Sequence, residues 1–143
     1  MKTIFLISCV SKKKDIQCMA SELYISPLFK LNYEFATKQN PAEIYILSAE
    51  YGLVTPYEQI EPYDKTLNNM KNHEIQLWAD KVLHSLKKLQ NIDNCKFIIL
   101  AGERYRRHLT PELKHYNVPL KGLTIGKQLQ KLKVLINDGQ SVA

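Results

Sequence analysis

Three short apolar segments recur along the chain, separated by stretches of mixed polarity. They are Thr3–Cys9, Glu43–Ser48 and Lys96–Ala101. Within each segment the apolar residues are nearly continuous, and Ile, Leu and Phe are frequent. Apolar runs of this length without alternation are typical of strands covered on both faces, as in a parallel sheet. A shorter segment, Tyr116–Leu120, predicts a fourth strand.

Helices are predicted between these strands. Ser26 followed by Pro27 is a typical helix start, because the hydroxyl caps the first turn and proline suits its first position; this helix should run to about Gln39. Apolar side chains at helical spacing predict a longer helix over Met70–Leu89. Further helical starts are expected at Gly102, at Thr110-Pro111 and at Thr124–Lys127.

The alternation of strands and helices predicts a single α/β domain over residues 1–143. We expect a three-layer sandwich whose central sheet has about four strands and is mostly parallel. A chain of 143 residues buries enough apolar surface to need no disulfide or metal staple. Neither an internal repeat nor a low-complexity segment is present.

Composition favours a cytoplasmic protein. No segment approaches about 18 consecutive apolar residues, so no membrane span or membrane partner is expected. The first apolar segment has neither a basic region before it nor a small-residue cleavage site, which argues against a signal peptide. Three cysteines without CxxC spacing favour a reducing compartment and argue against a zinc ribbon or a disulfide framework.

Charge is unevenly distributed along the chain. The 20 Lys and Arg residues exceed the 14 Asp and Glu residues, which gives a net charge of +6. A lysine triplet occupies residues 12–14, and all the arginines fall at Arg104, Arg106 and Arg107. Residues 50–64 carry carboxylates and no basic residue. A basic chain with one acidic loop fits a protein that approaches a polyanion, although an ordinary solvated surface explains the same pattern.

Small residues end all three apolar segments. The pairs are Ser8-Cys9, Ser48-Ala49 and Ala101-Gly102. Open parallel sheets bind ligands outside the carboxyl ends of their strands, and small side chains there leave room for a ligand; close packing of a helix on the strand is the alternative. After the first pair, Ser11, Lys12 and backbone N–H groups provide a possible phosphate site, although the P-loop pattern is absent.

The connection between Ala49 and Asn69 is the longest without a clear element. A connection of about 20 residues inside a compact domain is usually functional or disordered. Carboxylates lie near both of its ends, at Glu50 and Asp64. Its side chains also offer stacking faces and an amide that can read a base edge, at Tyr51, Tyr63 and Asn68.

Other chemistries find little support. The four histidines form neither HxxxH nor HExxH, so we expect no metal site and no cofactor. Cys9, at a strand end, is more typical of packing than of a nucleophile. Neither GxSxG nor GxGxxG occurs, which argues against the common hydrolase and dinucleotide-binding sites.

The motifs together resemble a family of uncharacterised bacterial and phage domains over nearly the whole chain. They are FLISCVSKKK, SELYISPLF, ILSAEYGLVTPYEQIEPYDKTLN, FIILAGERYRRHL and PLKGLTIGKQLQKL. The middle motif is also similar to the YaaA peroxide-stress proteins, which are implicated in DNA protection. The opening motif is similar to a segment of archaeosine synthase, a distant relative of the uracil-DNA glycosylase fold. The resemblance implies a uracil-DNA-glycosylase-like α/β domain that handles nucleobases or nucleic acid.

The resemblance also points to particular residues in three segments. In the first segment they are Ser8, Cys9, Ser11 and Lys12. In the second they are Ser48, Tyr51, Gly52, Tyr63 and Asp64, and in the third Gly102 and Tyr105. Relatives often carry another residue in place of Tyr51, so we do not expect Tyr51 to act as an essential acid or base.

Our first hypothesis is an enzyme that cleaves the N-glycosidic bond of a modified or damaged base in DNA. Asp64 would position water and stabilise the oxocarbenium-like transition state, with Glu50 as the reserve candidate. Asn68 and Ser48 would read the base, and Tyr51 and Tyr63 would stack on it after flipping. The phosphate contacts would come from Lys12, Lys13, Lys14, Arg104, Arg106, Arg107 and Lys127.

Two alternatives stay open at this point. One is a non-catalytic DNA-binding stress protein of the YaaA type, which shares the phosphate contacts and needs no carboxylate. The other is an enzyme that acts on a free nucleoside or nucleotide at the strand ends. In the first two hypotheses the partner is nucleic acid, and DNA is the expected polymer. The sequence leaves the oligomeric state open.

Overall fold

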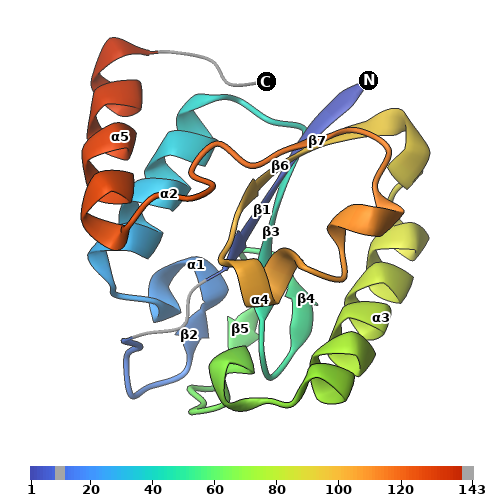
Figure 1. Cartoon of the computed structure of the whole chain (residues 1–143). Helices are drawn as coiled ribbons and strands as arrows, with labels where there is room; N and C mark the ends of the chain where they lie inside the picture. The colour runs from blue at the N-terminus through green and yellow to red at the C-terminus, as the bar shows by residue number, and fades with distance from the viewer. Residues whose placement is uncertain (9–11, 140–143) are drawn as a thin grey trace.

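A five-stranded sheet forms the centre of the computed structural model, which describes residues 1–8 and 12–139 (Figure 1). The strand order is β4-β3-β1-β6-β7. Their bounds are β1 (Lys2–Ser8), β3 (Glu43–Ser48), β4 (Gly52–Val54), β6 (Cys95–Leu100) and β7 (Tyr116–Asn117). All neighbouring strands are parallel except β4, which pairs with β3 in the antiparallel direction. The mostly parallel sheet is therefore confirmed, with one strand more than expected.

The three continuous apolar segments are the central strands of this sheet. Ile4, Phe5, Leu6 and Ile7 of β1 are all fully buried. Successive side chains of a strand point to opposite faces, so a strand without polar positions must be covered on both. Ile4 and Leu6 pack into one core, whereas Phe5 and Ile7 pack into a second core on the other face.

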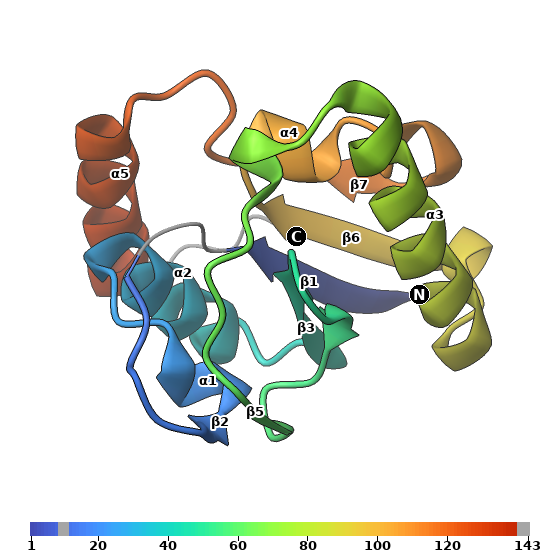
Figure 2. The same ribbon diagram turned by 90° about the horizontal axis from the view of Figure 1, so that it is seen from below.

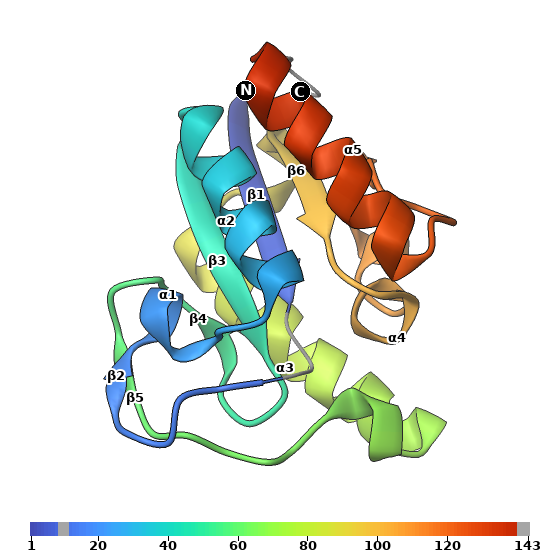
Figure 3. The ribbon, with the colours of Figure 1, turned by 90° about the vertical axis from the view of Figure 1, so that its left-hand side faces the viewer.

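Helices cover both faces of the sheet (Figure 2). One face is covered by α3 (Asn72–Leu89), whose buried stripe includes Trp78. The other face is covered by α2 (Pro27–Lys38) and α5 (Ile125–Asp138), which lie side by side (Figure 3). None of the helices in the described part of the chain is both long and apolar enough to cross a membrane.

The helix ends follow the expected capping chemistry in two cases. The Ser26 hydroxyl accepts a hydrogen bond from the Phe29 N–H at 3.3 Å and so caps α2. The Thr124 hydroxyl caps α5 by accepting from the Lys127 N–H at 3.4 Å. The helix expected after Gly102 is a single turn, α4 (Glu103–Arg106), because the chain restarts as a 3-10 turn at Thr110–Glu112.

The segment after β3 contains short elements that the sequence did not reveal. It forms β4, then β5 (Gln59–Ile60), and then a 3-10 turn over Leu67–Asn69. β5 pairs in the antiparallel direction with β2 (Cys18–Met19), which directly precedes α1 (Ala20–Leu23). The segment is therefore folded back against the chain that follows β1, and it is not an unstructured loop.

Candidate functional site

The strand order creates a crevice between the carboxyl ends of β1 and β6. The next strand of the sheet along the chain, β3, lies on one side of β1, whereas β6 lies on the other side of β1. After β1 the chain packs Phe29 of α2 against one face of the sheet, and after β6 it packs Tyr105 of α4 against the opposite face. Where the connections of neighbouring parallel strands leave to opposite faces, open α/β sheets bind their ligands.

A cavity of about 560 Å³ lies at this point, and we call it the switch-point cavity. It is bounded by the ends of β1 and β6, by α2, by α4 and by the first turns of α5. Its lining includes Ser8, Asn32, Leu100, Gly102, Tyr105 and Gln128. The volume falls in the range of about 300–1,000 Å³ that is typical of small-molecule sites.

Asn32 is a buried polar residue in the wall of this cavity. Its side chain comes from α2, and the residue is only 2% exposed. Its Oδ1 atom has no hydrogen-bond partner among the described residues. A buried polar atom without a partner costs about 1–3 kcal/mol, so such atoms are rare unless a ligand satisfies them. Asn32 therefore holds an unsatisfied acceptor inside the wall of the cavity, where the Oδ1 atom itself is buried.

Sequence reasoning missed Asn32, although one signal was present. Asn32 follows Phe29 by three residues and precedes Phe35 by three, so it lies on the apolar stripe of α2. An asparagine on a stripe that packs against a core is out of place, because its amide needs partners there. That position distinguishes it from the exposed asparagines of the chain.

Five residues of the expected site do line the cavity. They are Ser8, Asn68, Gly102, Arg104 and Tyr105. Tyr105 forms a fixed wall, because its hydroxyl accepts from the Leu67 N–H at 3.4 Å and its ring meets the edge of Trp78. Cys9 and Ser11 lie outside the described residues.

The arginine cluster serves several roles around α4. Arg107 donates to both carboxylate oxygens of Glu103, at 2.8 and 2.7 Å. The Nη1 of Arg106 donates to the Ala101 carbonyl at 3.0 Å and so holds the turn after β6. Arg104, on the rim of the cavity, has no hydrogen-bond or ion-pair partner within residues 1–8 and 12–139. Arg104 is thus the guanidinium available to an anionic ligand.

Glu103 is the only carboxylate among the described residues that line the cavity. The hydrogen bonds from Arg107, and then the positive charge of the nearby arginines, hold the pKa of Glu103 below its ordinary value. In turn, Glu103 raises the pKa of Arg107. Glu103 is therefore ionised at neutral pH and has no proton to donate.

The acidic residues expected to do chemistry lie elsewhere. Glu50 and Asp64 are both exposed, and neither lines the switch-point cavity. Ser48 is fully buried: its hydroxyl accepts from the Tyr51 N–H at 3.0 Å, and its carbonyl accepts from the Trp78 indole at 2.9 Å. Ser48 and Gly52 thus shape the β3–β4 turn, where Gly52 has a φ of 76°.

The tyrosines of the middle segment form a cluster with Lys13. The Tyr51 and Tyr63 rings meet edge to face, with centroids 5.6 Å apart. The Tyr63 and Tyr24 hydroxyls are hydrogen-bonded at 2.6 Å, and the Lys13 ammonium lies 4.5 Å from the Tyr63 ring centroid. This cluster is next to β2 and β5, and none of its members lines the switch-point cavity.

The lysine triplet lies beside the entrance to α2. Residues 12–14 run antiparallel to residues 23–25, because the Lys14 N–H donates to the Leu23 carbonyl at 2.8 Å and the Ile25 N–H donates to the Lys12 carbonyl at 3.0 Å. Lys12 and Lys14 are exposed. The chain then enters α2 at Ser26, which lines the cavity.

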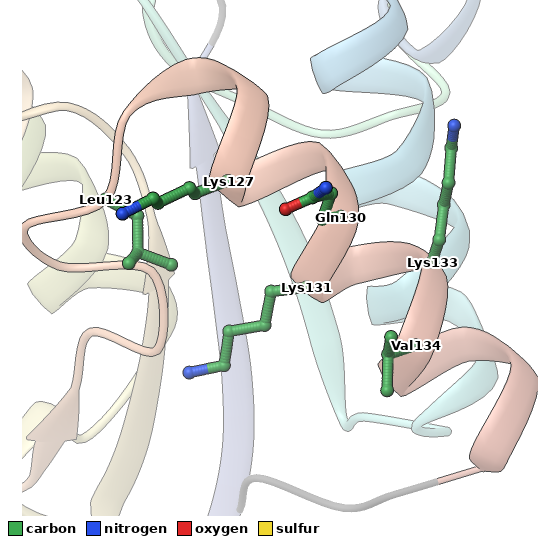
Figure 4. Close-up of a pocket in the computed structure, with 6 residues that line it drawn as sticks. All are labelled: Leu123, Lys127, Gln130, Lys131, Lys133 and Val134. Carbon is green, nitrogen blue, oxygen red and sulfur yellow. The ribbon is translucent and has the colours of Figure 1, made fainter.

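Lys127 belongs to a second basic surface on the exposed face of α5 (Figure 4). There it lines a depression of about 670 Å³, which we call the α5 depression, together with Leu123, Gln130, Lys131, Lys133 and Val134. A smaller cavity of about 300 Å³ shares Gly102 and Gln128 with the switch-point cavity and Leu123 with the α5 depression. The three hollows are therefore adjacent.

Within the described residues, no cluster of His, Cys, Asp and Glu could hold a metal ion. Residues 4–134 match a family model described as a family of unknown function, DUF6884. The chain belongs to this family. The family region of this DUF6884 chain includes every residue that lines the switch-point cavity.

One curated relative is also similar to this DUF6884 chain. A UPF0246 protein of Crocosphaera subtropica is 30% identical over 103 residues, which make up 68% of this chain and 40% of that protein. The chain thus spans well under half of the length of this relative. The match is consistent with the YaaA-like resemblance of the middle motif.

Proposed function

We propose that this DUF6884 protein is a non-catalytic nucleic-acid-binding protein of the YaaA stress-protein type, with DNA as its polymer. The observation that carries the proposal is the switch-point cavity, which has Arg104 at its rim and whose one carboxylate among the described lining residues, Glu103, is paired with Arg107. The similarity to a UPF0246 protein supports the same function class.

The placement of positive charge supports binding to a phosphate backbone. β1 and β6 are neighbours in the sheet, so the lysines that follow β1 and the arginines that follow β6 leave the same edge. Arg104 is on the rim of the cavity, and Lys127 is near its far side on α5. Clustered basic side chains bind nucleic acid by releasing its condensed counterions.

The geometry favours binding over glycosidic cleavage. Hydrolysis of an N-glycosidic bond needs a carboxylate that positions water or stabilises the transition state near the sugar. Asp64 and Glu50 do not line the cavity, and Glu103 is held in an ion pair with Arg107. We therefore do not propose a DNA glycosylase, and the test below includes a measurement that would detect one.

The proposal also includes an ancestry for the fold and a cellular compartment for the protein. The resemblance of the opening segment supports a uracil-DNA-glycosylase-like ancestry for the fold. The free, buried thiols of Cys18 and Cys95 support a reducing, cytoplasmic location.

The test is a salt titration of DNA binding. Anisotropy of labelled DNA should show an affinity that falls linearly with salt on a log–log scale, with a slope of about 0.7 per phosphate contacted on a single strand and about 0.9 on a duplex. Arg104→Gln should reduce this slope by about one contact. The matched control is Lys88→Gln, on the exposed end of α3, which should leave the slope unchanged.

Two results would contradict the proposal. Absence of salt-dependent binding to every DNA tested would remove nucleic acid as the partner. Release of a free base from DNA that carries modified bases, detected by mass spectrometry, would restore the glycosylase hypothesis in place of a binding protein.

A further inference from the structure

We infer that the switch-point cavity binds a small organic anion, whose apolar body enters the cavity and whose carboxylate or phosphate group lies at the rim beside Arg104 and Asn68. The inference goes beyond the proposed function, because it gives the cavity a ligand that is not a polymer. Its test contains no DNA, so the inference and the proposed function can fail independently of each other.

The walls of the cavity suit an apolar body. The larger apolar side chains that line it are Leu28, Phe29, Leu100, Tyr105, Ile125 and Leu129. Phe29 and Leu100 belong to one hydrophobic core and Tyr105 belongs to the other, so packing on both faces of the sheet fixes these walls. A hydrated group such as a sugar or a phosphate would lose its water against such walls without replacement. The interior of the cavity therefore favours the apolar part of a ligand.

The rim of the cavity has two unpaired polar side chains on neighbouring turns. Arg104 lies on α4, and Asn68 lies on the 3-10 turn Leu67–Asn69. Neither side chain has a hydrogen-bond or ion-pair partner within residues 1–8 and 12–139. The Leu67 N–H donates to the Tyr105 hydroxyl at 3.4 Å, and this bond joins the two turns. A guanidinium and an amide are therefore both available as donors to a ligand in the same cavity.

The charge around α4 selects an anion over a cation. Residues 103–107 contain three arginines and one glutamate. The Glu103 carboxylate is held by Arg107, at 2.8 and 2.7 Å, and Arg106 donates to a backbone carbonyl. Arg104 thus adds a positive charge that no carboxylate balances. A planar guanidinium binds the paired oxygens of a carboxylate or a phosphate, whereas an ammonium group would be repelled.

The two parts of such a ligand have separable effects on affinity. An exposed ion pair contributes little by itself, because water screens the two charges. Burial of apolar surface contributes more, but it carries no preference for charge. The apolar body should therefore decide whether a compound binds at all, and Arg104 should decide whether the anion is preferred over its neutral analogue.

The experiment measures the binding of three ligands that share one apolar body, by isothermal titration calorimetry. They are naphthoate, naphthyl phosphate and naphthamide, each substituted at the same ring carbon, and acetate is the anion without the body. At least one naphthyl anion should bind about fivefold or more tightly than naphthamide, because charge-assisted hydrogen bonds are stronger than neutral ones. Acetate should show no binding at the same concentrations. The order of the two anions identifies the headgroup.

The variant Arg104→Gln should reduce the affinity for the anions to that for naphthamide. Its affinity for naphthamide should not change, which shows that the cavity of the variant is intact. The matched control is Lys88→Gln, which removes one positive charge from the exposed end of α3 and should keep the full preference for the anion. Equal affinity for the anions and the amide in the protein itself, or an unchanged preference in Arg104→Gln, overturns the inference.

A second measurement locates the ligand in the wild-type protein. Intermolecular NOEs from the naphthalene protons should involve the methyl groups of Leu100 and Leu129, which line the switch-point cavity. NOEs to Val134 alone, which is exposed in the α5 depression, would place the anion on the lysine surface of α5. Absence of binding by all three naphthalene compounds would show that the cavity does not admit an apolar body. Either result overturns the inference.

Discussion

Two buried polar residues, Ser48 and Asn32, differ in whether the fold satisfies them. The Ser48 hydroxyl accepts from a backbone N–H, and its carbonyl accepts from an indole, so its polar groups connect β3 to the β4 turn and to α3. The Asn32 oxygen has no such partner among the described residues. A satisfied buried group stabilises the fold, whereas an unsatisfied one costs stability and is retained for another reason. Ser48 is therefore structural, whereas Asn32 carries a cost that the described residues do not offset.

This cost predicts that Asn32→Leu stabilises the free protein. The substitution removes a buried acceptor whose burial costs about 1–3 kcal/mol and places a strong helix former on the apolar stripe of α2. The free energy of unfolding, measured by urea denaturation in the absence of any ligand, should rise. Ser26→Ala is the comparison in the same helix, because loss of the N-cap should lower the free energy of unfolding by about 1 kcal/mol. A decrease in Asn32→Leu would mean that the amide is satisfied in solution.

Glu103 gives a second prediction at a single residue. Its folded-state pKa lies below the ordinary 4.5 because Arg107 donates to the ionised carboxylate. The contribution of this pair to stability is thus present above pH 4.5 and is lost as the pH falls through the folded value. A carbon-detected NMR titration should place the Glu103 midpoint below 4.5, and Arg107→Gln should move it upward. A midpoint that does not respond to Arg107→Gln would show that the pair does not form in solution.

Among the elements, the β3–β4 turn brings the middle segment back onto the sheet. Ser48 pairs with Gly52 across this turn, and Gly52 has a left-handed φ of 76°. A Cβ added there would meet the Val82 side chain only at 3.9 Å, which is ordinary contact. The need for glycine is therefore a property of the backbone and not of crowding.

Two glycine-to-alanine substitutions should accordingly have opposite signs. Gly52→Ala forces a side chain into the left-handed region and should lower the free energy of unfolding by about 1–2 kcal/mol. Gly126→Ala lies in the first turn of α5, with open space around it, and should raise that free energy by up to about 1 kcal/mol. Chemical denaturation of the two variants measures both values. Equal effects in the two variants would disprove the backbone explanation.

How far elements can be predicted from the sequence depends on their length. The continuous apolar segments and the long stripe of α3 carry enough residues for the pattern to show, and both are confirmed. β4 and β5 are only 3 and 2 residues long, so no periodicity marks them, and they form because β3 and β2 offer edges to pair with. The helix expected after Gly102 stops after one turn, and the chain restarts as a 3-10 turn at Thr110–Glu112.

In the whole molecule, the candidate site combines parts that are far apart in the sequence. Ser8 and Gly102 could be placed from the sequence, because small residues at the ends of parallel strands meet at one edge. Asn32 and Gln128 could not, because they line one cavity only once α2 and α5 pack side by side on the sheet. The middle segment was expected near the ligand, but its tyrosines pack beside β2 and β5 instead.

The same packing makes ligand binding a property of the whole fold. The walls of the switch-point cavity come from both hydrophobic cores, since Phe29 belongs to one and Tyr105 to the other. A ligand held between them binds the folded chain and not the unfolded one, so it stabilises the entire domain by mass action.

DNA at about 100 times its dissociation constant should therefore raise the free energy of unfolding by about 2.7 kcal/mol. Because the contacts involve phosphates, this gain should shrink as salt is added at a fixed DNA concentration, after subtraction of the effect of salt on the free protein. Thermal unfolding with and without DNA measures the gain. The Lys88→Gln variant should keep it, whereas Arg104→Gln should reduce it, since only Arg104 lies on the rim of the cavity. A gain that is the same at all salt concentrations would indicate that the DNA is held without its phosphates, contrary to the arrangement of basic side chains along this edge of the sheet.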